Sequence, residues 1–181
     1  MKGLLIVDVQ NDFCPGGALA VPVGDRVVPI INALMDRFTV IAASKDWHPH
    51  RTIHFDKWPV HCVHNSLGAE FHPALQSQRI DQVFLKGTGS KDDGYSAYEA
   101  TNANLEQYLK NRQVDELFVV GLATDYCVRQ SALDAAARGF RTFVVTDAVA
   151  AVDVKPGDGD RALEEIKAAG IALVASADVP N

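Results

Sequence analysis

The segment Leu117–Val128, read Leu-Phe-Val-Val-Gly-Leu-Ala-Thr-Asp-Tyr-Cys-Val, establishes the architecture of this chain. Its first residues are apolar and end at Gly121, which is typical of a strand buried on both faces. From Thr124 onward the apolar spacing becomes that of a helix, which Gly139 would end. The pattern therefore predicts that Cys127 lies in the first turn of a helix, just beyond the carboxyl end of a central strand.

That position favours a chemical role for Cys127. Free amides and the positive end of the helix dipole stabilise a thiolate there, although most buried free cysteines are packing residues. Two further strands end in ionisable groups: Leu4–Val7 is followed by Asp8, and Gln82–Leu85 by Lys86. The carboxyl ends of parallel strands build ligand sites, so a carboxylate, an ammonium and a thiol at one edge are difficult to explain by packing.

Composition limits the class of protein. The 181 residues suffice for one domain, expected to span 1–181, and the hydrophobic content of 48% fits an α/β protein. No apolar run is long enough to span a membrane, no signal peptide is expected, and the net charge of -6 argues against a nucleic-acid partner. The 3 cysteines do not form a disulfide pattern, which favours a reduced, cytoplasmic setting.

Strands and helices alternate along the whole chain. Besides the segments above, the patterns predict helices at Asp25–Phe38, Asn104–Asn111 and Asp160–Ala169, a helix start at Ser96, and strands at Thr39–Ala43, Thr142–Thr146 and Ile171–Ala175. This alternation predicts a three-layer, Rossmann-like α/β/α sandwich around a mainly parallel sheet of about six strands.

A histidine-rich segment follows the second predicted strand. Its members are His48, His50, His54, His61 and His64, preceded by Asp46. Carboxylate and imidazole ligands suit Zn, Fe or Mn, and Asp46 and His48 leave the strand at the same edge as Asp8. We predict Asp46, His48 and His61 as ligands of one divalent metal ion, with His54 as a candidate fourth, and expect His50 and His64 to be exposed. A surface histidine-rich loop is the alternative.

Two aromatic residues are candidates for a pocket wall. Phe13 lies in a long loop after the first strand, and Tyr95 precedes a capping-box sequence at Ser96. An anchoring role for Phe13 and a surface position for Tyr95 are equally compatible with the sequence. Cys14 has no predicted role, and the glycine-rich Lys86–Gly89 lacks the pattern of a phosphate-binding loop.

Five motifs, in order along the chain, resemble those of the nicotinamidase/pyrazinamidase family of isochorismatase-like cysteine hydrolases. They are Val-Asp-Val-Gln-Asn-Asp-Phe at 7–13, Asp-Trp-His-Pro at 46–49, Trp-Pro-Val-His-Cys at 58–62, Lys-Gly at 86–87 and Gly-Leu-Ala-Thr-Asp-Tyr-Cys-Val at 121–128. The resemblance extends from the first strand to the last, and the second and third motifs are the most specific to nicotinamidases.

The resemblance implies a role for individual residues. It makes Asp8, Lys86 and Cys127 the catalytic triad, Asp46, His48 and His61 the metal ligands, and His54 a ligand that only some members use. Zinc is the expected ion, with Fe and Mn as alternatives. The same resemblance places Phe13, Trp58, Tyr95, Leu122 and Ala123 around the substrate ring. It also implies a cis peptide between Leu122 and Ala123, which aims the amide of Ala123, with that of Cys127, at the substrate oxygen as an oxyanion hole.

The expected reaction is hydrolysis of nicotinamide to nicotinic acid and ammonia through a thioester on Cys127, a step of NAD salvage, with pyrazinamide a related substrate. Another amide or carbamoyl substrate is one alternative, and a non-catalytic metal- or ligand-binding module is a second. An isochorismatase activity is disfavoured, because cleavage of a vinyl ether needs no nucleophilic cysteine. No partner protein is indicated, so a monomer and a homo-oligomer both stay open.

Overall fold

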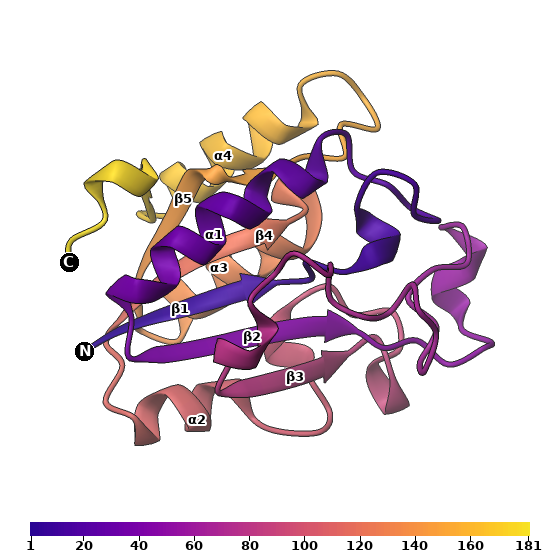
Figure 1. Cartoon of the computed structure of the whole chain (residues 1–181), viewed down its shortest axis with the longest axis horizontal. Coiled ribbons are helices and arrows are strands. Elements are labelled where there is room, and N and C mark those ends of the chain that lie inside the picture. The colour runs from indigo at the N-terminus through magenta and orange to yellow at the C-terminus, as the bar shows by residue number, and fades with distance from the viewer.

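The computed structural model describes residues 1–181 and contains one six-stranded sheet in the order β3-β2-β1-β4-β5-β6, with every neighbouring pair parallel (Figure 1). The strands are β1 (Lys2–Val7), β2 (Val40–Asp46), β3 (Gln82–Lys86), β4 (Glu116–Leu122), β5 (Arg141–Ala150) and β6 (Ala172–Val174). The strand order reverses between β1 and β4, and this is the point at which open α/β sheets bind ligands.

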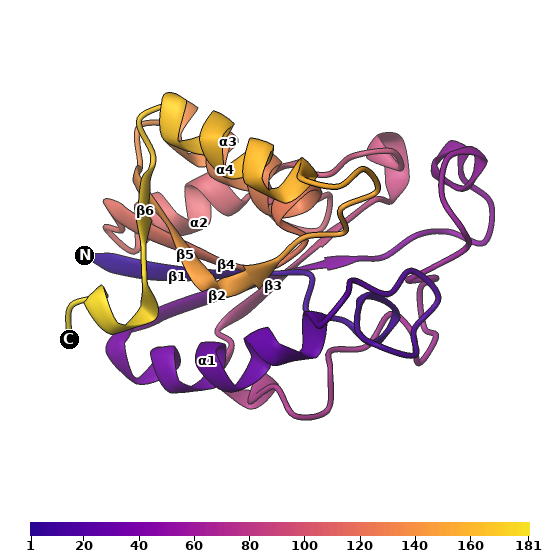
Figure 2. The same cartoon turned by 90° about the horizontal axis from the view of Figure 1, so that it is seen from above.

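Helices cover both faces of the sheet (Figure 2). They are α1 (Val27–Leu34), α2 (Leu105–Asn111), α3 (Arg129–Ala137) and α4 (Asp158–Ala168). One apolar core joins α1 to the sheet, and a second joins α2, α3 and α4 to the opposite face. The predicted three-layer α/β/α sandwich and its parallel, Rossmann-like sheet are confirmed.

Gly121 is required by the close approach of β4 to β1. Its φ is +112°, and an added Cβ would lie 2.1 Å from the carbonyl oxygen of Val7. The pairing of β4 with β5 also shifts register between Val119 and Gly121. Glycine at this strand end therefore lets the chain turn toward Cys127 while the backbones stay in contact.

The connection from β2 to β3 contains no α-helix. The helical segments of residues 47–81 are two 3-10 turns, Ile53–Asp56 and Ser77–Arg79. The crossover extends beyond the carboxyl ends of the strands (Figures 1 and 2). Cys62, Ala69 and Leu75 pack this crossover into the core on the α1 side. The segment that carries the histidines is thus tied down by loop contacts instead of helical hydrogen bonds.

Several predicted elements differ in extent. The predicted strand Thr39–Ala43 continues to Asp46, which is the last residue of β2. The predicted helix Asp25–Phe38 is α-helical only in α1 and continues as 3-10 turns at both ends. Ser96 does make the predicted capping box with Glu99, but the helix that it begins is a single 3-10 turn. Strand β5 runs past its predicted end because Val149 and Ala150 pair with the end of β4. No helix in the structure combines the length and apolar character that crossing a bilayer requires.

Candidate active site and metal centre

The three residues expected at the strand ends meet at one point. Lys86 Nζ lies 2.8 Å from Asp8 Oδ2 and donates to Cys127 Sγ at 3.4 Å. All three side chains are buried, and Lys86 and Asp8 are fully inaccessible. Ser44, from β2, donates to the other oxygen of Asp8 at 2.7 Å. A thiol, a carboxylate and an ammonium in contact are the groups that nucleophilic attack with proton transfer needs.

Burial dominates the electrostatics of this group. It raises the pKa of Asp8 above its usual value, although the Lys86 ammonium acts in the opposite direction. Burial also raises the pKa of Cys127 well above its usual range, and Lys86 opposes this only in part. Burial thus acts against the thiolate that the helix terminus and Lys86 were expected to favour. The thiol of Cys127 therefore lies beside a carboxylate whose pKa is raised, a pair suited to transfer of the thiol proton to Asp8.

Asp46 connects this group to the histidines. One of its oxygens is hydrogen-bonded to Lys86, while Oδ2 lies 3.5 Å from His48 Nε2 and 3.8 Å from His61 Nε2. Burial would raise the pKa of Asp46, but the Lys86 ammonium and the two imidazoles outweigh it and hold that pKa well below its usual range. Asp46 is thus an ionised carboxylate, as a metal ligand must be.

Gln10 fixes the backbone of Asp46. Its side-chain oxygen accepts from the amide of Asp46 and its side-chain nitrogen donates to the carbonyl of Asp46, both at 2.8 Å. Asp12 fixes the other end of the metal segment by accepting from the amide of Cys62 at 2.7 Å. Neither role was predicted, although both residues belong to the first of the quoted motifs. The available signal was their place in the loop that follows the first predicted strand, a few residues beyond Asp8.

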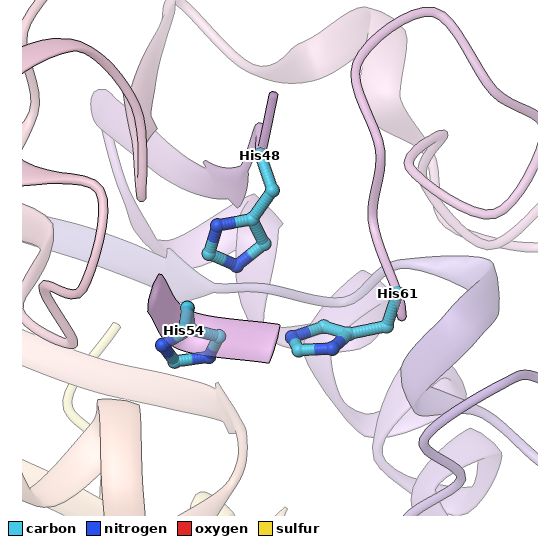
Figure 3. Close-up of side chains that lie close together, drawn as sticks. All are labelled: His48, His54 and His61. Atoms are coloured by element: carbon cyan, nitrogen blue, oxygen red, sulfur yellow. The ribbon is translucent and has the colours of Figure 1, made fainter. Parts of the chain in front are cut away.

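Three histidines face a common space, and Figure 3 shows their rings converging. The imidazole nitrogens of His48, His54 and His61 that face this space lie within 4.8 Å of one another. Nδ1 of each ring is hydrogen-bonded on the side away from this space. The partner is the carbonyl of Gly87 for His48 at 2.8 Å, Asp93 for His54 at 2.9 Å and the carbonyl of Pro59 for His61 at 2.6 Å. Nδ1–H donation leaves the lone pair on Nε2, pointing inward.

This donor set fits a divalent metal ion. His48 Nε2 is buried and has no hydrogen-bond partner, which is costly for a polar atom unless a ligand occupies it. His54 is as buried as the other two histidines and belongs to the cluster. His50 is exposed as expected, but the expectation for His64 is wrong: His64 is half-buried, with its ring 5.1 Å from that of His50.

A small, mainly apolar pocket opens beside Cys127. The residues that line it are Phe13, Leu19, Asp46, His54, Trp58, His61, Tyr95, Leu122, Ala123, Tyr126, Cys127 and Val152. All of the predicted ring-pocket residues are among them. Trp58 Nε1 donates to the hydroxyl of Tyr95 at 3.0 Å, and the ring of Tyr126 packs edge-on against Trp58. The aromatic wall is therefore held together by its own contacts.

The sequence did not predict a role for Asp125, which lies beside Cys127. Its two carboxylate oxygens accept from the amides of Val152 at 3.0 Å and Asp153 at 2.9 Å. Asp125 is 5% exposed, whereas the loop that it holds is mostly at the surface. This carboxylate thus fixes Val152, a wall of the pocket, from the turn that carries the cysteine.

The turn itself differs from a plain helix start. Thr124–Val128 is a π-helical turn that continues directly into α3, and the carbonyl of Ala123 accepts from the amides of Tyr126 and Val128. The peptide between Leu122 and Ala123 is cis, as the resemblance implied. Leu122 and Ala123 are both buried and line the pocket.

Comparison with known proteins agrees with this fold and site. The family model described as the isochorismatase domain matches residues 2–178. The molecule therefore belongs to the isochorismatase-like hydrolases, with the fold of that class.

Individual relatives narrow this class. The nicotinamidase of Escherichia coli is 41% identical over 98% of this chain and 96% of its own length. The solved pyrazinamidase of Pyrococcus horikoshii in complex with zinc has a TM-score of 0.86 at 41% identity, covering 96% of this chain and 98% of its own. A protein of L. infantum solved with nicotinate has a TM-score of 0.91 at 36% identity, covering 98% and 93%. The chain belongs to the nicotinamidase/pyrazinamidase family.

Proposed function

We propose that this chain is a nicotinamidase, which hydrolyses nicotinamide to nicotinic acid and ammonia and so supplies NAD salvage. The observation that carries the proposal is Cys127 in contact with Lys86 and beside Asp8, in the lining of a small, mainly apolar pocket that four aromatic side chains help to form. Full-length relatives named nicotinamidase support the substrate. Pyrazinamide, an amide on a ring of the same size, would be a second substrate, as the name of the P. horikoshii relative suggests.

The chemistry follows from the contacts of Cys127. Asp8, which lies beside the sulfur, would take the thiol proton as the sulfur attacks the carboxamide carbon. The amides of Ala123 and Cys127 would hold the oxyanion, and loss of one such donor typically costs about 10²–10³ in rate. Asp8 returns the proton to the departing ammonia, which leaves a thioester on Cys127. Water deprotonated by Asp8 then releases nicotinic acid and restores the thiol.

Lys86 keeps the buried charges balanced during these steps. Its ammonium contacts both Asp8 and Asp46, and the two carboxylates raise the pKa of Lys86 well above its usual range despite burial. It therefore stays protonated and opposes the negative charge that moves between Asp8, Cys127 and the substrate.

Asp46, His48, His54 and His61 would hold one divalent metal ion, most simply Zn, with Fe and Mn as alternatives. The inward Nε2 lone pairs and the ionised Asp46 supply suitable donors. A bound ion would supply a Lewis acid for the ring nitrogen, which fixes the ring while the carboxamide reaches Cys127. The cytoplasm is the proposed location, and small-molecule substrate is the only partner proposed.

The deciding experiment measures ammonia release from nicotinamide with metal-stripped protein and after addition of Zn, Mn or Fe. Release that depends on metal supports the amidase chemistry and the histidine site together. Release without metal would keep the triad but assign the histidines a structural role. No release with any metal, from folded protein, would favour the alternative of another amide or carbamoyl substrate.

Cys127→Ala tests the covalent step in the same assay. It should abolish turnover without loss of bound metal, and residual activity above a few per cent would contradict a thioester. Cys14→Ala is the matched control, because Cys14 is also a buried free cysteine but does not line the pocket. This variant should keep its activity.

A further inference from the structure

The loop that follows β3 accepts hydrogen bonds from Nδ1 of two of the three clustered histidines. His48 Nδ1 donates to the carbonyl of Gly87 at 2.8 Å, and His54 Nδ1 donates to Asp93 Oδ1 at 2.9 Å. His61, in contrast, uses the carbonyl of Pro59 from its own segment. The residues after Lys86 therefore orient histidines that come from a different crossover.

The hydrogen-bond partner of His54 Nδ1 is a carboxylate, whereas the partners of His48 and His61 are neutral backbone carbonyls. A carboxylate accepts a hydrogen bond about twice as strongly as a neutral carbonyl and makes the opposite ring nitrogen a better ligand. The His54 ring is 4% exposed and the Asp93 side chain 27% exposed, so solvent screens this contact only in part. Among the three histidines, only His54 donates from Nδ1 to a carboxylate.

Asp93 is itself held in place. Its second oxygen is paired with Lys57, which lies at the end of the turn that carries His54. Thr52 caps the same turn by accepting from the amide of His54 at 3.1 Å, and its hydroxyl donates to the carbonyl of Asp92 at 3.3 Å. The two loops are thus joined at three points around one imidazole ring.

We propose that Asp93 is a positioning residue of the metal centre: its carboxylate fixes His54 with Nε2 inward and so makes His54 a metal ligand in this chain. The inference rests on the metal site of the proposed function. It explains why His54 belongs to the cluster, and it assigns a role to a loop residue for which neither the motifs nor the spacing gave any signal.

The test compares metal affinity of Asp93→Ala and Asp92→Ala. Zn²⁺ binding is measured by competition with a chromophoric chelator at fixed pH, with circular dichroism to verify folding. Loss of a partner behind a metal-bound histidine typically weakens metal binding about 10–100-fold, and we expect that loss for Asp93→Ala. Asp92→Ala should remain within about twofold of the parent, because Asp92 meets the histidine turn through its backbone carbonyl.

A double-mutant cycle separates this role from general support of the loop. If Asp93 acts through His54, then adding Asp93→Ala to a His54→Ala protein should not weaken Zn²⁺ binding further. Asp93→Asn, which retains an acceptor oxygen without the charge, should fall between the parent and Asp93→Ala. In Co²⁺-loaded protein, Asp93→Ala should shift the visible absorption bands in the same direction as His54→Ala.

Three results would overturn the proposal. Unchanged affinity in Asp93→Ala would show that the carboxylate does not act on the site. Additive losses in the double variant would show that it acts by a route other than His54. If the parent protein itself binds no Zn²⁺ or Co²⁺, the metal site of the proposed function fails and this inference fails with it, whereas the first two results leave that site intact.

Discussion

Asp125→Asn is expected to loosen the wall of the pocket without affecting the reacting groups. In the parent, one carboxylate oxygen accepts from the amide of Val152 at 3.0 Å and the other from that of Asp153 at 2.9 Å. Asparagine retains one acceptor oxygen but turns an NH₂ group toward the second amide. One charge-assisted hydrogen bond is lost, and two donors then face each other in a site that is 5% exposed.

The magnitude follows from these contacts. A hydrogen bond to a charged group contributes about 1.5–3 kcal/mol, so the free energy of unfolding should fall by about 2–3 kcal/mol. For a chain of this length that lowers Tm by roughly 5–10 °C. Displacing the half-buried Val152 removes part of an apolar wall, about 1 kcal/mol of ring binding, which raises KM for nicotinamide about fivefold. Because Val152 lines the pocket and is not one of the triad residues, kcat should change little.

The assay combines thermal unfolding with steady-state ammonia release. Asp153→Asn is the matched control in the same loop: Asp153 Oδ1 accepts from the amide of Gly159 at 2.8 Å, at the start of α4. Asparagine retains a side-chain oxygen that can accept from this amide, and Asp153 is exposed, so this variant should retain both Tm and KM. If Asp125→Asn also retains both, the reasoning is refuted; if kcat falls and KM does not, Asp125 acts on the turn of Cys127 instead.

Two further predictions concern protonation and the aromatic wall. Burial raises the pKa of Asp8, so this base holds its proton to a higher pH than an ordinary carboxyl group does. The acid limb of kcat/KM should therefore lie above about pH 4. A pH profile that is flat down to about pH 4 would contradict this prediction. Tyr95→Phe removes the oxygen that accepts from Trp58 Nε1, at a cost of about 1 kcal/mol, and should raise KM about fivefold with kcat unchanged. Tyr98→Phe is its control, because the Tyr98 hydroxyl has no hydrogen-bond partner, and equal KM values in the two variants would make Tyr95 a packing residue only.

The parts of the fold and site that depend on strand ends were predictable from sequence. Buried parallel strands are continuous apolar runs, and an ionisable residue directly after such a run must lie at the carboxyl edge of the sheet. That rule placed Asp8, Lys86 and Cys127 at one edge, and the structure brings them into contact. The cis peptide before Ala123 came from the family resemblance alone, whereas the metal ligands were first favoured by their chemistry and their place after a strand.

The parts that depend on loops were not predictable. Asp93, Asp125 and Val152 act through contacts between segments that are 27 to 39 residues apart in the chain, and no periodic pattern encodes such contacts. The effect of burial on the Cys127 thiol was also missing from the sequence analysis, for a related reason. A helix terminus and a lysine can be read from the sequence, but the degree to which three strand ends exclude water from the thiol cannot.

The crossover without an α-helix has a consequence for how this enzyme family can diversify. From Asp46 to His61, a single continuous stretch between two neighbouring strands supplies the proposed metal ligands and Trp58 of the pocket wall. The triad residues come from elsewhere, at the ends of β1, β3 and β4. An exchange of this one segment could therefore alter the metal ligands and part of the ring pocket while Asp8, Lys86 and Cys127 stay on their own strands and turn, provided that a carboxylate is kept opposite Lys86.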